Sequence, residues 1–76
     1  MQWSERIVTD PDVPAGKPVV RGTRLSAEFL LDLLAAGQSE ATILDHYSGL
    51  EHEDILACLA YASYLAHQHR AYLIPA

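Results

Sequence analysis

The chain has 76 residues, of which half are hydrophobic and 20% are charged, and its formal net charge at pH 7 is −5. This length allows one small domain, and this composition argues against a disordered segment. A single cysteine excludes an internal disulfide framework, the apolar stretches are too short for a membrane span and the N-terminus has no leader pattern, so we expect a cytoplasmic protein.

The charges are distributed unevenly along the chain. Residues 1–26 hold four basic and three acidic side chains, whereas residues 27–76 hold seven acidic side chains and a single basic one, Arg70. This distribution favours a basic partner, or a phosphate backbone contacted by the first third of the chain alone. It argues against nucleic-acid binding across the whole surface.

The N-terminal third is predicted to form a two-stranded ribbon. Arg6-Ile7-Val8 and Val19-Val20 are short apolar stretches that favour β-strands, and each is ended by residues typical of turns. A two-stranded ribbon is marginally stable by itself, so it must pack on helices or on another chain. Asp10 and Asp12 lie between the strands, where we expect them to form turns by bonding their own backbone.

Two short helices are predicted next. The first runs from Ala27 to Ala36, with Ser26 as its N-cap and Gly37 as its stop. Four residues at helical spacing form its expected core face: Phe29, Leu30, Leu33 and Leu34. Ser39 then caps a second helix, and three of its residues are expected to face inward: Ile43, Leu44 and Tyr47.

The third helix begins near Glu51 or His52, after a turn that contains glycine, and two helices joined in this way match the helix-turn-helix pattern. Every residue from Ile55 to Ala66 except Ser63 is apolar or aromatic, so we expect both sides of the helix to be buried. One side faces the chain's own core. The other side is predicted to meet a second copy across a two-fold axis through Ala57, Ala60, Tyr61 and Tyr64. The alternative is that the two tyrosines lie singly on the surface with their hydroxyls in water.

A longer motif joins these elements. The run Gly-Lys-Pro-Val-Val-Arg-Gly-Thr-Arg at residues 16–24 is preceded by Ile-Val-Thr-Asp-Pro at residues 7–11 and followed by the leucine-rich helix, Ala36-Gly37 and Leu59-Ala60-Tyr61-Ala62. In these motifs, over residues 6–65, the chain resembles the domain of unknown function 433 family. The resemblance implies a helix-turn-helix-like, homeodomain-like fold. Several members of that family are antitoxins paired with PIN-type nuclease toxins, so the resemblance also implies an antitoxin.

The predicted fold is therefore α+β and mainly α, with a single domain over residues 1–76. It comprises a ribbon arm (residues 1–25), a three-helix, homeodomain-like bundle (residues 26–70) and a tail (residues 71–76). The tail contains an apolar triplet at residues 72–74, which we expect either to fold back on its own dimer or to dock on another protein.

Catalytic chemistry has little support in the sequence. Cys58 lies among leucines on the inward side of the third helix, where a thiol is an inert apolar group. His67 and His69 are two residues apart, so on a helix they point away from each other, and no cysteine pair or His-Glu motif has the spacing of a zinc site. We expect no enzymatic activity, no metal and no cofactor.

DNA binding is the usual function of a helix-turn-helix, but the third helix starts with acidic residues. Glu51, Glu53 and Asp54 would repel DNA phosphates, although they also suit a helix N-terminus. If DNA is bound, the better candidates are five residues of the strand-turn segment: Lys17, Arg21, Thr23, Arg24 and Ser26. The alternative is that the two arginines are structural and pair with Asp10, Asp32 or Asp45.

The leading hypothesis is a non-enzymatic, antitoxin-like protein that binds and neutralises a PIN-like nuclease toxin, with operator DNA as a further candidate ligand of its homodimer. The toxin assignment follows from the resemblance alone. Charge and apolarity select the candidate partner contacts: Glu51, Glu53, Asp54, Tyr72, Leu73 and Ile74. The alternatives are a DNA-binding transcriptional regulator without a toxin partner and a structural dimerisation module.

Overall fold

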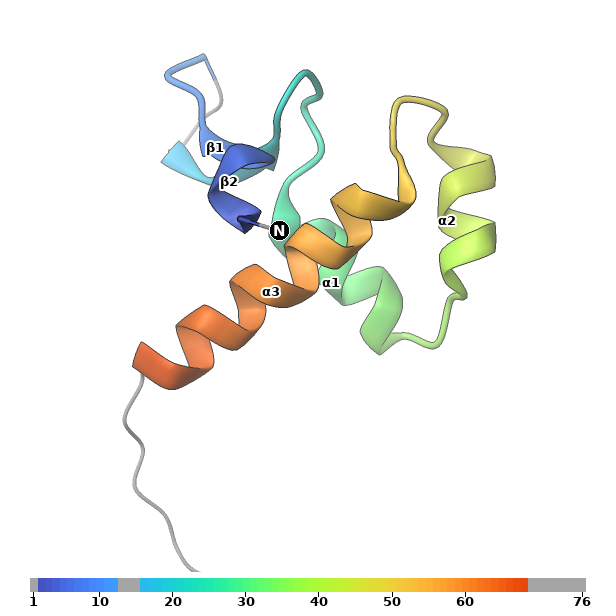
Figure 1. Ribbon diagram of the computed structural model, residues 1–76. Helices are drawn as coiled ribbons and strands as arrows, with labels where there is room; N and C mark the ends of the chain where they lie inside the picture. Colours follow the sequence, from blue (N-terminus) through green and yellow to red (C-terminus); the bar gives the residue numbers. More distant parts are fainter. Residues whose placement is uncertain (1, 13–15, 69–76) are drawn as a thin grey trace, which may run out of the picture.

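The structure, a computed structural model, describes residues 2–12 and 16–68 of the chain. Its elements in chain order are the 3-10 helix η1 (Trp3–Glu5), the strands β1 (Ile7–Thr9) and β2 (Pro18–Val20), and the helices α1 (Ala27–Ala35), α2 (Glu40–His46) and α3 (His52–Gln68) (Figure 1). A two-stranded antiparallel ribbon followed by three helices confirms the predicted fold class. The predicted tail contacts Tyr72, Leu73 and Ile74 lie outside the described residues.

The strand β2 is held on both of its edges. It pairs antiparallel with β1, so that Val20 lies opposite Ile7, and on its other edge Val19 forms a bridge with Ser26, immediately before α1. Ile7, Val19 and Val20 are buried. The ribbon thus has the strands predicted for it, and it packs on helices of the same chain.

The two short helices begin at the serines that the sequence predicts. The hydroxyl of Ser26 accepts from the Phe29 N–H at 3.0 Å, and the hydroxyl of Ser39 accepts from the Thr42 N–H at 3.1 Å. At the end of α1, Gly37 has a φ of 94°, a conformation that favours glycine and turns the chain away from the helix axis.

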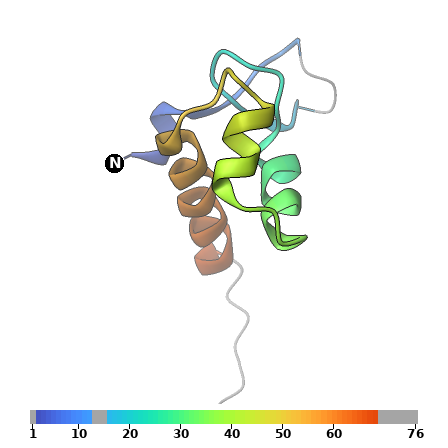
Figure 2. The same cartoon turned by 90° about the vertical axis from the view of Figure 1, so that its right-hand side faces the viewer.

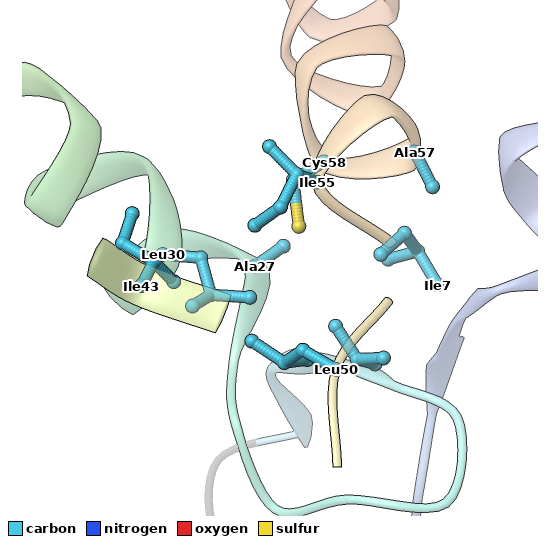
Figure 3. Packing of buried hydrophobic residues seen from close by; sticks show 9 residues of the cluster. Ile7, Ala27, Leu30, Ile43, Leu50, Ile55, Ala57 and Cys58 are labelled. Atoms are coloured by element: carbon cyan, nitrogen blue, oxygen red, sulfur yellow. The ribbon is translucent and has the colours of Figure 1, made fainter. Parts of the chain in front are cut away.

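The core lies where the ribbon meets the three helices (Figure 3). Every element except η1 contributes to its buried hydrophobic residues: Ile7, Val19, Val20, Ala27, Leu30, Ile43, Leu50, Ile55, Ala57 and Cys58. Phe29 was expected there but is 39% exposed, and its ring packs edge-on against Tyr47. The reason is that the buried stripe of α1 runs through Ala27 and Leu30, which lie at least about 100° around the helix from Phe29.

The chain's own N-terminus covers part of the second apolar side of α3. The indole of Trp3 packs against two tyrosines of α3. Its ring centroid lies 5.1 Å from that of Tyr61 and 5.2 Å from that of Tyr64. Ala57, expected at a dimer interface, is instead completely buried in the core. The 3-10 helix η1, which packs on this side of α3, was not predicted from the sequence. Figure 2 shows α3 between η1 on one side and α1 and α2 on the other.

Candidate functional site

One buried carboxylate fixes the start of α3. Asp54 Oδ2 accepts a hydrogen bond at 2.9 Å from the N–H of Glu51, the residue before the helix. This is the returning half of a capping box, in which the side chain at the third helical position accepts from the N–H of the residue before the helix. Asp54 was expected to contact a partner, but it is only 6% exposed and both of its oxygens are engaged within the chain. Asp54 is therefore not part of the exposed surface at the start of α3.

Arg6 links the ribbon to the start of α3. Its Nη1 donates to Asp54 Oδ1 at 3.0 Å and to Glu51 Oε1 at 3.2 Å. These hydrogen bonds, above all the one to Asp54, raise the pKa of Arg6 above its ordinary value. A cleft of about 370 Å³ opens beside this link, and Glu5 and Arg21 lie on its wall. Arg6 could not be assigned to a site from the sequence, because its carboxylate partners are 45 and 48 residues away in the chain.

Carboxylates gather where α2 and α3 meet, and together they are termed the acidic surface: the exposed Glu51 and Glu53 and the half-buried Glu40. Glu40 pairs with His52, and this hydrogen bond ties α2 to α3 and raises the pKa of the His52 imidazole. No lysine or arginine occurs between Arg24 and Arg70. The described helices therefore present negative charge without a permanent cation of their own.

Three of the candidate DNA-binding residues are engaged within the fold. Lys17 Nζ pairs with Glu28 Oε1 at 2.8 Å, which raises the pKa of the lysine and lowers that of the glutamate. The Thr23 hydroxyl donates to the Val20 carbonyl at 2.8 Å, and Ser26 caps α1. These three side chains stabilise the junction between β2 and α1.

The other two candidates, Arg21 and Arg24, are exposed. Within residues 2–12 and 16–68, neither guanidinium makes an ion pair, so the expected pairing with Asp10, Asp32 or Asp45 is not found there. Asp10 instead accepts from the Asp12 N–H at 2.8 Å, which confirms that it forms a turn with its own backbone. Both arginines are available for an anionic ligand.

Nucleophilic chemistry has no suitable thiol at this site. Cys58 is completely buried, and burial raises the pKa of its thiol to about 11, so little thiolate exists at neutral pH. In the part of the chain that the structure describes, no three histidine, cysteine or carboxylate side chains gather in the manner of a metal site. None of the described helices combines the length and the apolarity that crossing a membrane requires.

Residues 7–62 match the family model described as a protein of unknown function (DUF433). The matched segment spans the ribbon, α1, α2 and the first part of α3, and it includes the acidic surface. It begins immediately after Arg6, so the arginine that holds the start of α3 lies just outside it. No curated protein and no solved structure matches the chain.

Proposed function

The chain belongs to the DUF433 family, and from this premise we propose that it is a non-enzymatic, antitoxin-like protein that binds and neutralises a PIN-like nuclease. In this proposal the acidic surface of Glu40, Glu51 and Glu53 docks on the basic groove where the nuclease holds its RNA. The chain then acts by occupying that groove, without chemistry of its own.

The one-sided charge of the helices supports this function. Among the carboxylates, Glu28 pairs with Lys17, and Asp54 and Glu51 share the single positive charge of Arg6, so the start of α3 keeps a net negative charge. A nuclease must attract a phosphate backbone, so its substrate groove is basic. Carboxylates at this helix junction are complementary to such a groove and compete with phosphate for it.

The first test is recovery of the partner from the native host with a tagged chain. We expect a small nuclease that is inactive in the complex and active in a ribonuclease assay after separation. Adding the chain back should inhibit it again at a one-to-one ratio of binding sites. A companion without nuclease activity, or a nuclease that stays active when the chain is bound, contradicts the proposal.

A matched pair of variants tests the surface itself. Glu51→Gln removes one charge from the acidic surface, and Asp32→Asn removes one from the exposed face of α1. We expect the first change to weaken binding of the recovered nuclease about fivefold and the second to leave it unchanged. Equal weakening by both would indicate a general effect of net charge and would exclude a specific acidic surface.

A DNA-binding regulator is the second candidate, because Arg21 and Arg24 are exposed and make no ion pair in the described part of the chain. The double change Arg21→Ala and Arg24→Ala should then weaken duplex binding and reduce its salt dependence, with little change in melting temperature. Duplex affinity that stays constant between about 50 and 200 mM salt would exclude this function.

A further inference from the structure

The side of α3 that faces away from the core carries exposed apolar side chains. It is termed the outer seam and consists of Leu56, Leu59, Ser63 and Ala66, all of which are exposed. Their spacing of three, four and three residues places them on one face of the helix. Leu56 is 39% exposed and Leu59 is 46% exposed, so two large apolar side chains of this seam lie open to solvent.

The outer seam is complementary to a second copy of itself in one orientation. Its spacing is that of the a and d positions of a coiled coil, with two leucines towards the start of α3 and two small residues towards its end. In an antiparallel pair, Leu59 faces Ser63 of the second copy and Leu56 faces Ala66, so each leucine fills the space above a small residue. A parallel pair would set leucine against leucine and leave the small residues facing a gap.

Charge favours a second copy at this seam. A chain with a net charge of −5 repels its own copies over most of its surface, but residues 55–69 contain no Asp, Glu, Lys or Arg. Glu53 and His67 lie two heptads apart on the same flank of the seam, and the antiparallel arrangement brings each glutamate beside the histidine of the other copy. His67 Nδ1 donates to the Ser63 carbonyl at 2.8 Å, which holds the ring beside the seam.

From these observations we propose that the chain forms a homodimer in which two α3 helices pack antiparallel along the outer seam, with Ala60 beside the two-fold axis. The dimer covers the end of α3 that projects beyond the other elements in Figure 1. Of the interface residues expected from the sequence, Ala60 borders this seam, whereas Ala57 lies in the core and Tyr61 and Tyr64 pack on Trp3. The dimer does not depend on nuclease binding.

Sedimentation equilibrium of the purified full-length chain tests the dimer. The wild type should sediment at twice the chain mass, and Leu59→Lys should weaken association on the order of a hundredfold by placing a charge in the seam. Leu65→Lys is the matched control, because Leu65 is equally exposed but lies on the side of α3 that faces Leu31 of α1. It should leave the mass unchanged, and circular dichroism should show that both variants keep their helices.

A wild-type monomer at high micromolar concentration would overturn the dimer, as would dissociation by Leu65→Lys and not by Leu59→Lys. A monomer whose complex with the nuclease is abolished by Leu59→Lys would also overturn it, and it would assign the seam to the nuclease.

Cysteine crosslinking tests the orientation. With copper(II) as the oxidant, Ala60→Cys should form a disulfide-linked dimer, because the two copies of residue 60 meet beside the axis of an antiparallel pair. Ser63→Cys should not, because it faces Leu59 of the other copy. The native Cys58 is buried and stays out of the reaction. Crosslinking by Ser63→Cys alone would indicate a parallel pair, and crosslinking by neither would overturn the seam as the interface.

Discussion

The two halves of α3 have similar apolar sequences and different surroundings. All the buried residues of this helix lie in its first half: Asp54, Ile55, Ala57 and Cys58. In the second half, from Leu59 to Gln68, no residue is buried, and Leu59, Tyr64 and Leu65 are each nearly half exposed. The same kind of sequence is therefore covered by its own chain in one half and left open in the other.

The lengths of the elements explain this difference. α3 has 17 residues and α1 has 9, which at 1.5 Å per residue correspond to about 25 and 14 Å. The ribbon and the short helices fill the space around the start of α3, and its last turns project beyond them in both views (Figures 1 and 2). An apolar helix sequence thus indicates that a surface will be covered, while the length of its neighbours decides whether the same chain covers it.

The largest expected effect is a difference in unfolding free energy between a substitution in the first half of α3 and one in the second half. Ile55→Ala leaves a cavity in the core and should lower the free energy of unfolding by about 3 kcal/mol, whereas Leu59→Ala should cost less than about 0.5 kcal/mol in a dilute, monomeric sample. Chemical denaturation followed by circular dichroism measures both. Equal losses would mean that the second half is embedded as deeply as the first.

The next effect concerns the cap that starts the first half. Asp54→Ala removes the hydrogen bond to the Glu51 N–H and the bond from Arg6, so we expect a loss of about 2 kcal/mol in the free energy of unfolding. Glu53→Ala, at the exposed neighbouring position, is the control and should stay within about 0.5 kcal/mol of the wild type. If the two variants have the same free energy of unfolding, the buried carboxylate does not stabilise the start of the helix.

A smaller effect tests where the covered half ends. Trp3→Ala removes the indole that packs on Tyr61 and Tyr64, and we expect it to lower the free energy of unfolding by about 1 kcal/mol, or roughly 4–8 °C in melting temperature. Leu65→Ala, which truncates an exposed side chain one residue beyond Tyr64, should have little effect. An unchanged melting temperature for Trp3→Ala would show that η1 does not stabilise α3.

Features that depend on neighbouring residues could be predicted from the sequence. The serine caps at Ser26 and Ser39, the glycine stop at Gly37 and the two strands follow from local backbone chemistry, and the structure confirms them. The acidic character of the start of α3 is equally visible in the sequence. Local preferences of this kind act between residues that are only a few positions apart in the sequence, so the sequence alone is enough to predict them.

Features that depend on distant contacts could not be predicted. Arg6 and Asp54 are 48 residues apart, so nothing in the sequence shows that one neutralises the other, or that Asp54 is the buried member of three carboxylates. Trp3 takes up part of a helix face that otherwise suggests a second copy. For the same reason the helical spacing of α1 could not show that Ala27, and not Phe29, faces the core. Whether a side chain is buried depends on which distant element packs against it, and the spacing of residues within one element does not give that information.

The smallest expected effect concerns the contact between the first half of α3 and α2. Glu40 raises the pKa of His52 above its ordinary value of 6.5 through their hydrogen bond. Because this pKa is higher in the folded state, the pair's stabilisation is fully present below the unfolded value and is lost as the pH rises through the folded value. The melting temperature of the wild type should therefore exceed that of His52→Gln by a small margin at acidic pH.

That margin should disappear as the pH rises past the folded-state pKa of His52, and salt should reduce it because the pair is exposed. Ile43 is the one buried residue of α2, and Leu44 packs partly buried against the core. A margin that stays constant with pH would show that His52 joins the two helices by packing and not by charge.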